Sequence, residues 1–270
     1  MSASIPQALW DARIPLHVTH PSAPTAPFIT SIPRFSYLAL LLPRLSAFFN
    51  TTCSSFYFEN VLLRNLAAGL LVDLYRPSLP WRLVVNDGVS WDISDTFLNA
   101  AKEADFIRNG NANQIMKMSK SDTTQLWHAV IDNDYVAFSR INSRLLNAPT
   151  TLKHVPIRIY LPLAPSSSAS GEGELTALDQ HQHQDTDGSS AGTFKIIQSL
   201  IQPVGMDRKP KLLGHALKDT MPKLFPSSRD PVMANVLLHG VAVPFNAPLV
   251  DLMREAAYPD GWLSFVVGVL

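Results

Sequence analysis

Residues 95–108, Asp-Thr-Phe-Leu-Asn-Ala-Ala-Lys-Glu-Ala-Asp-Phe-Ile-Arg, separate two β-rich parts of the chain and so decide its organisation. Within them Phe97, Ala101 and Ala104 recur at the spacing of three to four residues that gives an α-helix one apolar face. Helical patterns continue until Asn147, and Pro149 follows them. We therefore predict a helix-rich domain over residues 94–150.

The residues on either side of this domain predict strands. Before it, the patterns predict a short helix (6–10), strands at 13–18, 37–42, 56–59, 61–65 and 81–85, and a helix at 66–75. After it, they predict strands at 155–160, 193–204, 235–240 and 262–270, with helices at 212–221 and 248–257. Residues 21–33 contain four prolines and are expected to form a loop. The second part has the element order of a ubiquitin-like, or β-grasp, unit, and the first ninety residues follow the same order.

The predicted fold class is α+β, with two ubiquitin-like domains flanking the helix-rich domain and a short helix at the N-terminus. The N-terminal helix and first ubiquitin-like domain are assigned to residues 1–93, and the second ubiquitin-like domain to residues 151–270. Residues 165–192, rich in Ser, Gly, Gln, His and acids, form an insertion that we predict to be disordered.

Composition narrows the classes of function. The 270 residues include 22 Lys plus Arg and 22 Asp plus Glu, so no strong net field would attract a nucleic acid. Cys53 is the only cysteine, which excludes an intrachain disulfide and fits a reducing, cytosolic compartment. No secretion signal or membrane-spanning segment is expected.

Signatures of catalysis are missing from the sequence. It has no P-loop, dinucleotide-binding glycine fingerprint, G-x-S-x-G or H-E-x-x-H motif, and we expect no cofactor and no metal. Cys53 is the one possible thioester-forming nucleophile, but Thr52 and Ser54 beside it give no sign of activation. We therefore expect a protein without catalytic residues.

Lys102 attracts attention through its position on the predicted helix. At about 100° per residue it lies nearly opposite the apolar face, which predicts an exposed amine. Most lysines are exposed, and a solvated charge beside Glu103 and Asp105 explains this pattern equally well. Phe106, four residues further on, shares the exposed side and is a candidate docking contact.

Short motifs along nearly the whole chain resemble the autophagy protein five family. Near the start they are Leu9-Trp10, Arg13-Ile14-Pro15, Tyr37-Leu38, Leu41-Leu42-Pro43, Gly69-Leu70-Leu71-Val72-Asp73-Leu74 and Leu79-Pro80-Trp81. Further along they are Lys102-Glu103-Ala104-Asp105, Gln125-Leu126-Trp127, Ile141-Asn142, Pro156-Ile157-Arg158-Ile159-Tyr160, His239-Gly240, Pro248-Leu249 and Tyr258-Pro259-Asp260. Each is weak alone, whereas their order and spacing together are specific.

The resemblance implies a role for the Lys-Glu-Ala-Asp motif. In this family that lysine accepts the ubiquitin-like modifier autophagy protein twelve through an isopeptide bond, which assigns Lys102 as acceptor and Glu103, Ala104, Asp105 and Phe106 as its motif and possible docking contacts. The conjugate works with the coiled-coil protein autophagy protein sixteen and with E1-like and E2-like enzymes. Together they stimulate, in the manner of a ligase, transfer of autophagy protein eight to phosphatidylethanolamine.

The resemblance also implies a location and further contacts. The protein is expected in the cytoplasm and peripherally at the preautophagosomal structure membrane. Apart from the resemblance, the basic residues Arg108, Lys117 and Lys120 lie near Lys102 without matching a sharp motif of the family, and they are candidate contacts with the membrane or the E2 complex. Trp10 and Arg13 are candidates for the coiled-coil partner's groove, expected between the two ubiquitin-like domains and the N-terminal helix.

Three alternatives remain open from the residues. The first is a plain β-grasp interaction module that is never conjugated. The second is that the chain is itself a modifier, which is disfavoured because a modifier must end in an exposed glycine and this chain ends Gly-Val-Leu. The third is a thioester enzyme, which requires an exposed Cys53 with a base nearby.

Overall fold

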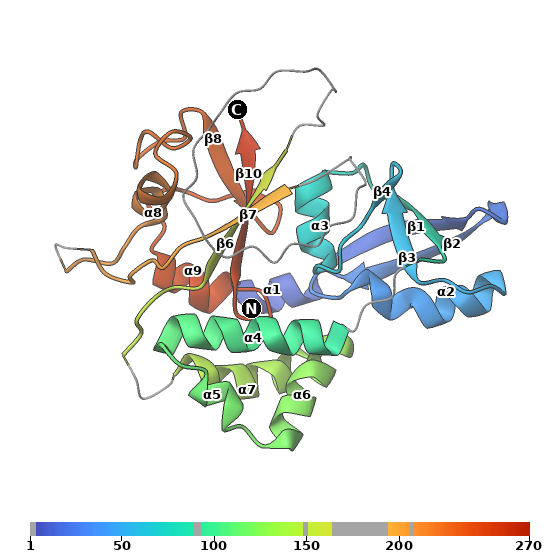
Figure 1. Ribbon diagram of the computed structural model, residues 1–270, viewed down its shortest axis with the longest axis horizontal. Coiled ribbons are helices and arrows are strands. Elements are labelled where there is room, and N and C mark those ends of the chain that lie inside the picture. Colours follow the sequence, from blue (N-terminus) through green and yellow to red (C-terminus); the bar gives the residue numbers. More distant parts are fainter. Residues whose placement is uncertain (1–3, 89–92, 148–150, 164–193, 206–207) are drawn as a thin grey trace.

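The computed structural model of the protein describes residues 4–88, 93–147, 151–163, 194–205 and 208–270. It contains two five-stranded sheets and, between them in the sequence, a group of helices (Figure 1). This confirms the α+β class. The insertion at 165–192 lies outside the described residues, as do residues 89–92 and 148–150 beside the predicted domain boundaries, so these boundaries remain predictions.

The first sheet has the strand order β2-β1-β5-β3-β4. Its central strands β1 and β5 are parallel, and the other neighbours are antiparallel. Buried and exposed residues alternate strictly along β5, as expected of a strand with one face on a core. In chain order its elements are α1 (Ile5–Asp11), β1 (Arg13–His20), β2 (Ala23–Pro33), the 3₁₀ helix η1 (Leu38–Leu41), α2 (Leu42–Phe49), β3 (Ser55–Phe58), β4 (Val61–Leu62), α3 (Ala68–Tyr75) and β5 (Trp81–Asn86).

The second sheet repeats this topology, with the order β7-β6-β10-β8-β9 and a parallel central pair, β6 and β10. Both sheets therefore have the β-grasp arrangement, in which the first and last strands lie side by side at the centre. The elements are β6 (Ile157–Pro162), β7 (Phe194–Gln198), α8 (Leu213–Thr220), β8 (Ala234–Leu238), β9 (Val241–Ala242), α9 (Leu249–Ala256) and β10 (Leu263–Val269).

Strand β10 of the second sheet also packs against the part of the chain that forms the first sheet. Residues 263–268 are all buried, unlike the alternating pattern of β5. Helix α3, which belongs to the first half of the chain, packs against β10. The largely apolar sequence of β10 is therefore explained by burial on both faces.

The helical region lies below the two sheets in Figure 1, with its longest helix nearest to them. Its elements are α4 (Ile93–Asn109), α5 (Asn113–Met116), α6 (Lys120–Ile131) and α7 (Tyr135–Leu146). The side chains of Ser119 and Asp134 cap the first turns of α6 and α7 by accepting backbone hydrogen bonds. None of the helices in the described residues is long and apolar enough to cross a lipid bilayer.

Two predicted elements were wrong. The proline-rich segment 21–33, expected to be a loop, contains the edge strand β2, where a missing proline N–H is tolerated because one side of the strand has no partner. Residues 37–42, expected to be a strand, form η1 and the start of α2. Leu38, Leu41 and Leu45 are buried at helical spacing, but the unbroken apolar run hides that period.

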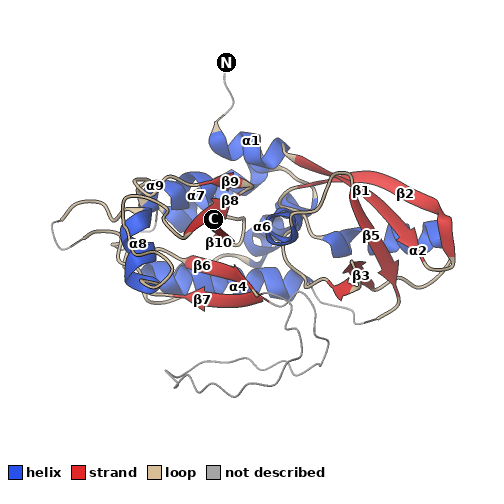
Figure 2. Ribbon diagram, turned by 90° about the horizontal axis from the view of Figure 1, so that it is seen from above, coloured by secondary structure: helices blue, strands red, loops and turns tan. Residues whose placement is uncertain are grey.

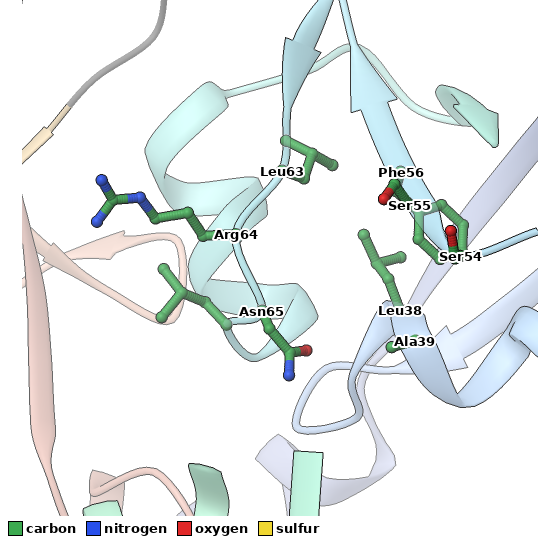
Figure 3. A pocket seen from close by; sticks show the side chains of 9 residues that line it. Leu38, Ala39, Ser54, Ser55, Phe56, Leu63, Arg64 and Asn65 are labelled. Atoms are coloured by element: carbon green, nitrogen blue, oxygen red, sulfur yellow. The ribbon is translucent and has the colours of Figure 1, made fainter. Parts of the chain in front are cut away.

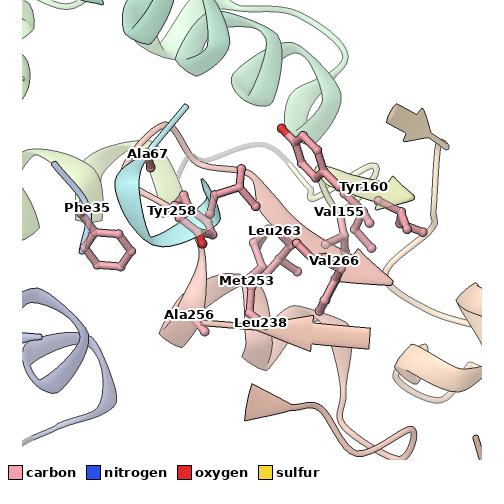
Figure 4. Close-up of a cluster of buried hydrophobic side chains, with 14 of the residues drawn as sticks. Phe35, Ala67, Val155, Tyr160, Leu238, Met253, Ala256, Tyr258, Leu263 and Val266 are labelled. Atoms are coloured by element: carbon pink, nitrogen blue, oxygen red, sulfur yellow. The ribbon is translucent and has the colours of Figure 1, made fainter. Parts of the chain in front are cut away.

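A hydrophobic cluster extends across the whole junction between the two halves. It includes Trp10 and Phe35 from the first half together with residues of the helical region and the second sheet. Phe35 packs edge-on against Tyr258, with ring centroids 5.5 Å apart, as can be followed in Figure 4. Figure 2 shows α1 lying beside α7 and α9, where Trp10 enters this cluster. The helices and the second sheet thus share one core, which Trp10 and Phe35 enter from the first half, whereas the first sheet packs around a second core that includes Leu16, Trp81 and Val85.

Candidate functional site

Lys102 lies in the middle of α4, and its side chain is partly exposed. Its Nζ lies 3.4 Å from Oδ1 of Asn99, one turn earlier, at the long limit of a hydrogen bond. Within the described residues Lys102 forms no ion pair, because the neighbouring carboxylates are engaged elsewhere. Its amine is thus only weakly held.

Glu103 faces the second sheet. Its carboxylate pairs with Nη2 of Arg158 on β6 at 2.5 Å, although 59% of the Glu103 side chain stays exposed. Arg158 in turn stacks on Trp262, with its guanidinium carbon 3.9 Å from the ring centroid. Glu103 is therefore already used within the fold.

Ala104 and Asp105 are fully buried, which corrects their assignment as docking contacts and the picture of Asp105 as a solvated charge. The Asp105 carboxylate accepts hydrogen bonds from Asn109 Nδ2 at 2.7 Å and from the backbone N–H of Ile115 at 3.1 Å. The second bond fixes α5 onto α4. Asp105 cannot meet a partner without unfolding this corner.

Arg108 was expected to contact a membrane or enzyme, and the structure contradicts this because Arg108 is only 3% exposed. Burial lowers the pKa of its guanidinium, and the nearby Asp105 and Asp260 counteract that effect. The other two candidate cations, Lys117 and Lys120, are exposed, so a surface role remains a prediction for them. Phe106 is 56% exposed on α4, one turn after Lys102.

Trp10 and Arg13 differ in environment. Trp10 is buried among aromatic rings, with Phe138 closest at 4.8 Å between centroids, and its carbonyl accepts a hydrogen bond from Asn133 Nδ2 at 3.1 Å. Arg13 is exposed and donates to Ser31 on the neighbouring strand. Trp10 is therefore a core residue at the edge of a hollow, and Arg13 does not line that hollow.

The hollow lies between α1, α7 and α9 and has a volume of about 170 Å³. It combines an apolar floor with polar and charged residues at its edge. Its lining residues are Pro6, Leu9, Trp10, Phe35, Tyr135, Phe138, Ser139, Asn142, Ser143, Leu146, Met253, Arg254, Glu255 and Ala257.

Two other features do not provide a catalytic site. Figure 3 shows a hollow between η1, β3 and residues 63–66 whose volume of about 20 Å³ holds roughly one water molecule. Cys53 is buried, and burial raises the pKa of its thiol, which disfavours the thioester enzyme. Within the described part of the chain no three His, Cys, Asp or Glu side chains are grouped to hold a metal.

Some connections between the domains involve residues that sequence reasoning did not single out individually. Arg34 pairs with the buried Asp73, and Asp73 also accepts a hydrogen bond from the backbone N–H of Gly240. Trp262 donates from Nε1 to the carbonyl of Ala100 at 2.9 Å. Except for Arg34, Ala100 and Trp262, these residues stand within the resembling motifs, which was the only available signal.

Comparison with known proteins agrees with this architecture. Family models described as the UblA domain, the alpha-helical bundle region and the UblB domain of autophagy protein ATG5 match residues 9–87, 92–148 and 154–267. The chain is 81% identical over 270 residues to autophagy-related protein 5 of Beauveria bassiana and 68% identical over 271 residues to that of Gibberella zeae, in each case covering 100% of both chains.

A solved structure supports the fold. The crystal structure of Kluyveromyces marxianus Atg5 matches with a TM-score of 0.71 over 98% of this chain and 99% of that one, at 18% sequence identity. The chain belongs to the autophagy protein 5 family, as shown by the three matching family models, by the relatives aligned over the whole of both chains, and by the order of the two ubiquitin-like domains around the helices.

Proposed function

We propose that Lys102 accepts the ubiquitin-like modifier autophagy protein twelve through an isopeptide bond, within the autophagy role of the family. The observation that carries this proposal is that the residues of the Lys-Glu-Ala-Asp motif differ in their burial and pairing. Glu103, Ala104 and Asp105 are each engaged in the fold, whereas the Lys102 amine is partly exposed and has one long contact. Lys102 is thus the member of the motif that is free to react.

The conjugation reaction requires little of this chain beyond an accessible amine. The Lys102 amine loses a proton and attacks the carbonyl carbon of a thioester between the modifier and an E2-like enzyme. A C–N bond forms, the C–S bond breaks, and the E2 thiolate leaves and regains a proton. An E1-like enzyme supplies the activated modifier. The chain contributes a fixed amine, and Phe106 beside it is a docking contact for the incoming proteins.

The conjugate then acts as a non-catalytic part of a ligase-like complex. The coiled-coil protein autophagy protein sixteen binds the hollow between α1, α7 and α9, whose apolar floor suits one face of an amphipathic helix. The assembly stimulates transfer of autophagy protein eight to phosphatidylethanolamine. It works in the cytoplasm and peripherally at the preautophagosomal structure membrane.

The test is reconstitution with the E1-like enzyme, the E2-like enzyme, the modifier and ATP, read as a gel shift. The wild-type chain should form one adduct, and Lys102→Arg should form none while retaining its circular dichroism spectrum. Lys117→Arg and Lys120→Arg are matched controls, because both lysines are exposed in the same helical region. Cys53→Ala should also conjugate normally.

The outcomes separate the alternatives. An adduct that persists in Lys102→Arg excludes Lys102 as acceptor. A wild-type chain that forms no adduct with active enzymes favours the unconjugated β-grasp interaction module. Loss of the adduct in a folded Cys53→Ala variant restores the thioester enzyme as a candidate.

A further inference from the structure

The second ubiquitin-like domain contacts α4 at positions before and after Lys102 in the sequence. Two residues before the lysine, the Ala100 carbonyl accepts a hydrogen bond from Trp262 Nε1. After it, Gly261 approaches so closely that a Cβ atom built there would lie 3.2 Å from Ala104 Cβ and 3.0 Å from Arg108 Nη1. The segment 261–262 therefore follows the surface of α4 through two helical turns.

This contact lies on the side of α4 away from Lys102. With about 3.6 residues per turn, Lys102 points roughly 160° around the helix axis from both Ala100 and Ala104. A rigid contact on one face of a helix fixes its rotation about its own axis, and this rotation sets the direction of the side chain on the other face. The contacts of Trp262 and Gly261 with α4 thereby orient the Lys102 side chain outward.

A second contact prevents α4 from rolling. Glu103 pairs with Arg158, whose guanidinium carbon lies over the Trp262 ring, 3.9 Å from its centroid, and whose Nη1 is 4.0 Å from Asp260 Oδ2. Arg158 and Trp262 are nearly buried, so they are held in place by the second sheet. Glu103 is the immediate neighbour of Lys102 and is tied to this rigid group.

We propose that Trp262 and Arg158 are positioning residues for the conjugation reaction, acting through Ala100 and Glu103 to orient Lys102. This inference rests on the proposed function of Lys102. Neither residue touches the reacting atoms. A displacement of about 1 Å at a reacting atom lowers a rate by up to about a hundredfold, so a small rotation of α4 has a large effect on the rate.

The first test is single-turnover conjugation with a preformed E2–modifier thioester at varied concentration. Trp262→Phe keeps the ring under Arg158 and removes only the Nε1 donor, while Arg158→Met keeps much of the stacked side chain and removes its charge. Both should lower the maximal rate roughly threefold to thirtyfold and leave the half-saturating concentration unchanged. Glu103→Gln, which still accepts a hydrogen bond, should retain most of the rate that Glu103→Ala loses.

The control is Val236→Ala, which weakens the core of the same sheet at a fully buried position of β8, away from Arg158 and the segment 261–262. It should lower the melting temperature and leave the maximal rate unchanged well below that temperature. Equal slowing by Val236→Ala, or wild-type rates in Trp262→Phe and Arg158→Met, would overturn the positioning role. In the double variant Glu103→Ala with Arg158→Met the two losses should not add, and additive losses would show that Glu103 acts directly on a partner.

The second test needs no conjugation. A nitroxide label at Lys102→Cys, in a Cys53→Ser background, should become more mobile in its electron paramagnetic resonance spectrum when Trp262→Phe is added. A label at Lys218→Cys, exposed on α8, should not change. Unchanged mobility at position 102 contradicts the inference. If the wild type forms no adduct, the proposed function fails, and the spectra still decide whether Trp262 orders position 102.

Discussion

The carboxylate of Asp73 accepts a hydrogen bond at 3.0 Å from the backbone N–H of Gly240, which lies 167 residues later in the chain. Asp73 is on α3, and Gly240 follows β8 of the second sheet. The same carboxylate pairs with Arg34 at 2.5 Å, and its side chain is only 2% exposed. The Asp73 carboxylate, held in place by an ion pair within the first ubiquitin-like domain, therefore connects that domain to the second through its hydrogen bond with Gly240.

Asp73→Ala is expected to destabilise the protein by about 3–5 kcal/mol, because it leaves the mostly buried Arg34 without its counter-charge. Urea unfolding measures this loss. Asp219→Ala is a matched control, since its ion pair with Lys211 is 65% exposed on the Asp219 side and should be worth about 1 kcal/mol or less. Similar losses in the two variants would show that Asp73 has no special role at the junction.

His239 should make the stability depend on pH. Burial lowers its pKa from 6.5 to about 4, and its Nε2 lies 2.8 Å from the carbonyl oxygen of Ala256. The unfolded chain therefore binds a proton at His239 more readily than the folded chain does. The resulting stabilisation is complete above about pH 6.5 and is lost as the pH falls towards 4.

The measurement compares free energies of unfolding of the wild type and His239→Asn between pH 4 and 7. Asn suits the positive φ of 54° at this position and does not titrate. The wild-type curve should fall more steeply on acidification, so the difference between the two proteins should shrink. Parallel curves would mean that His239 is protonated as easily in the folded chain as in the unfolded one.

Gly261→Ala should be more harmful than Gly240→Ala. Both glycines have positive φ, 85° and 82°, so each substitution introduces backbone strain of about 1 kcal/mol. Only at Gly261 does the new methyl group also press on α4, whereas the nearest atom at Gly240 is 3.5 Å away. We expect a total loss of roughly 2–3 kcal/mol for Gly261→Ala in urea unfolding. Equal losses would mean that α4 can move away at little cost.

Deleting residues 165–192 should hardly change the thermal stability. Pro162 on β6 pairs directly with Phe194 on β7, so the deletion leaves a three-residue connection, a common length for a hairpin. A shorter loop also loses less entropy on closing. We expect a melting temperature within about 3 °C of the wild type by calorimetry. A large drop would show that the segment packs on the domain.

Much of the architecture followed from local pattern. The helical spacing of Phe97, Ala101 and Ala104 predicted α4, and the element order on both sides predicted two β-grasp units. The errors arose where local pattern and tertiary position disagree. Prolines suggested a loop in β2 because the sequence does not say that this strand is at an edge, and the dense leucines of η1 and α2 concealed a helical period.

The sequence by itself determined the family, the α+β class and Lys102 as the candidate acceptor, because helical period and the order of motifs can both be read along the chain without knowing its folding. Only the tertiary structure decided what surrounds that lysine. Burial and pairing depend on residues far away in the chain: Asp105 and Arg108 look like surface charges on their own helix but are covered in the folded protein. Arg158 and Trp262 are brought to α4 solely by the packing of the second sheet, and that packing leaves Lys102 as the free member of its motif.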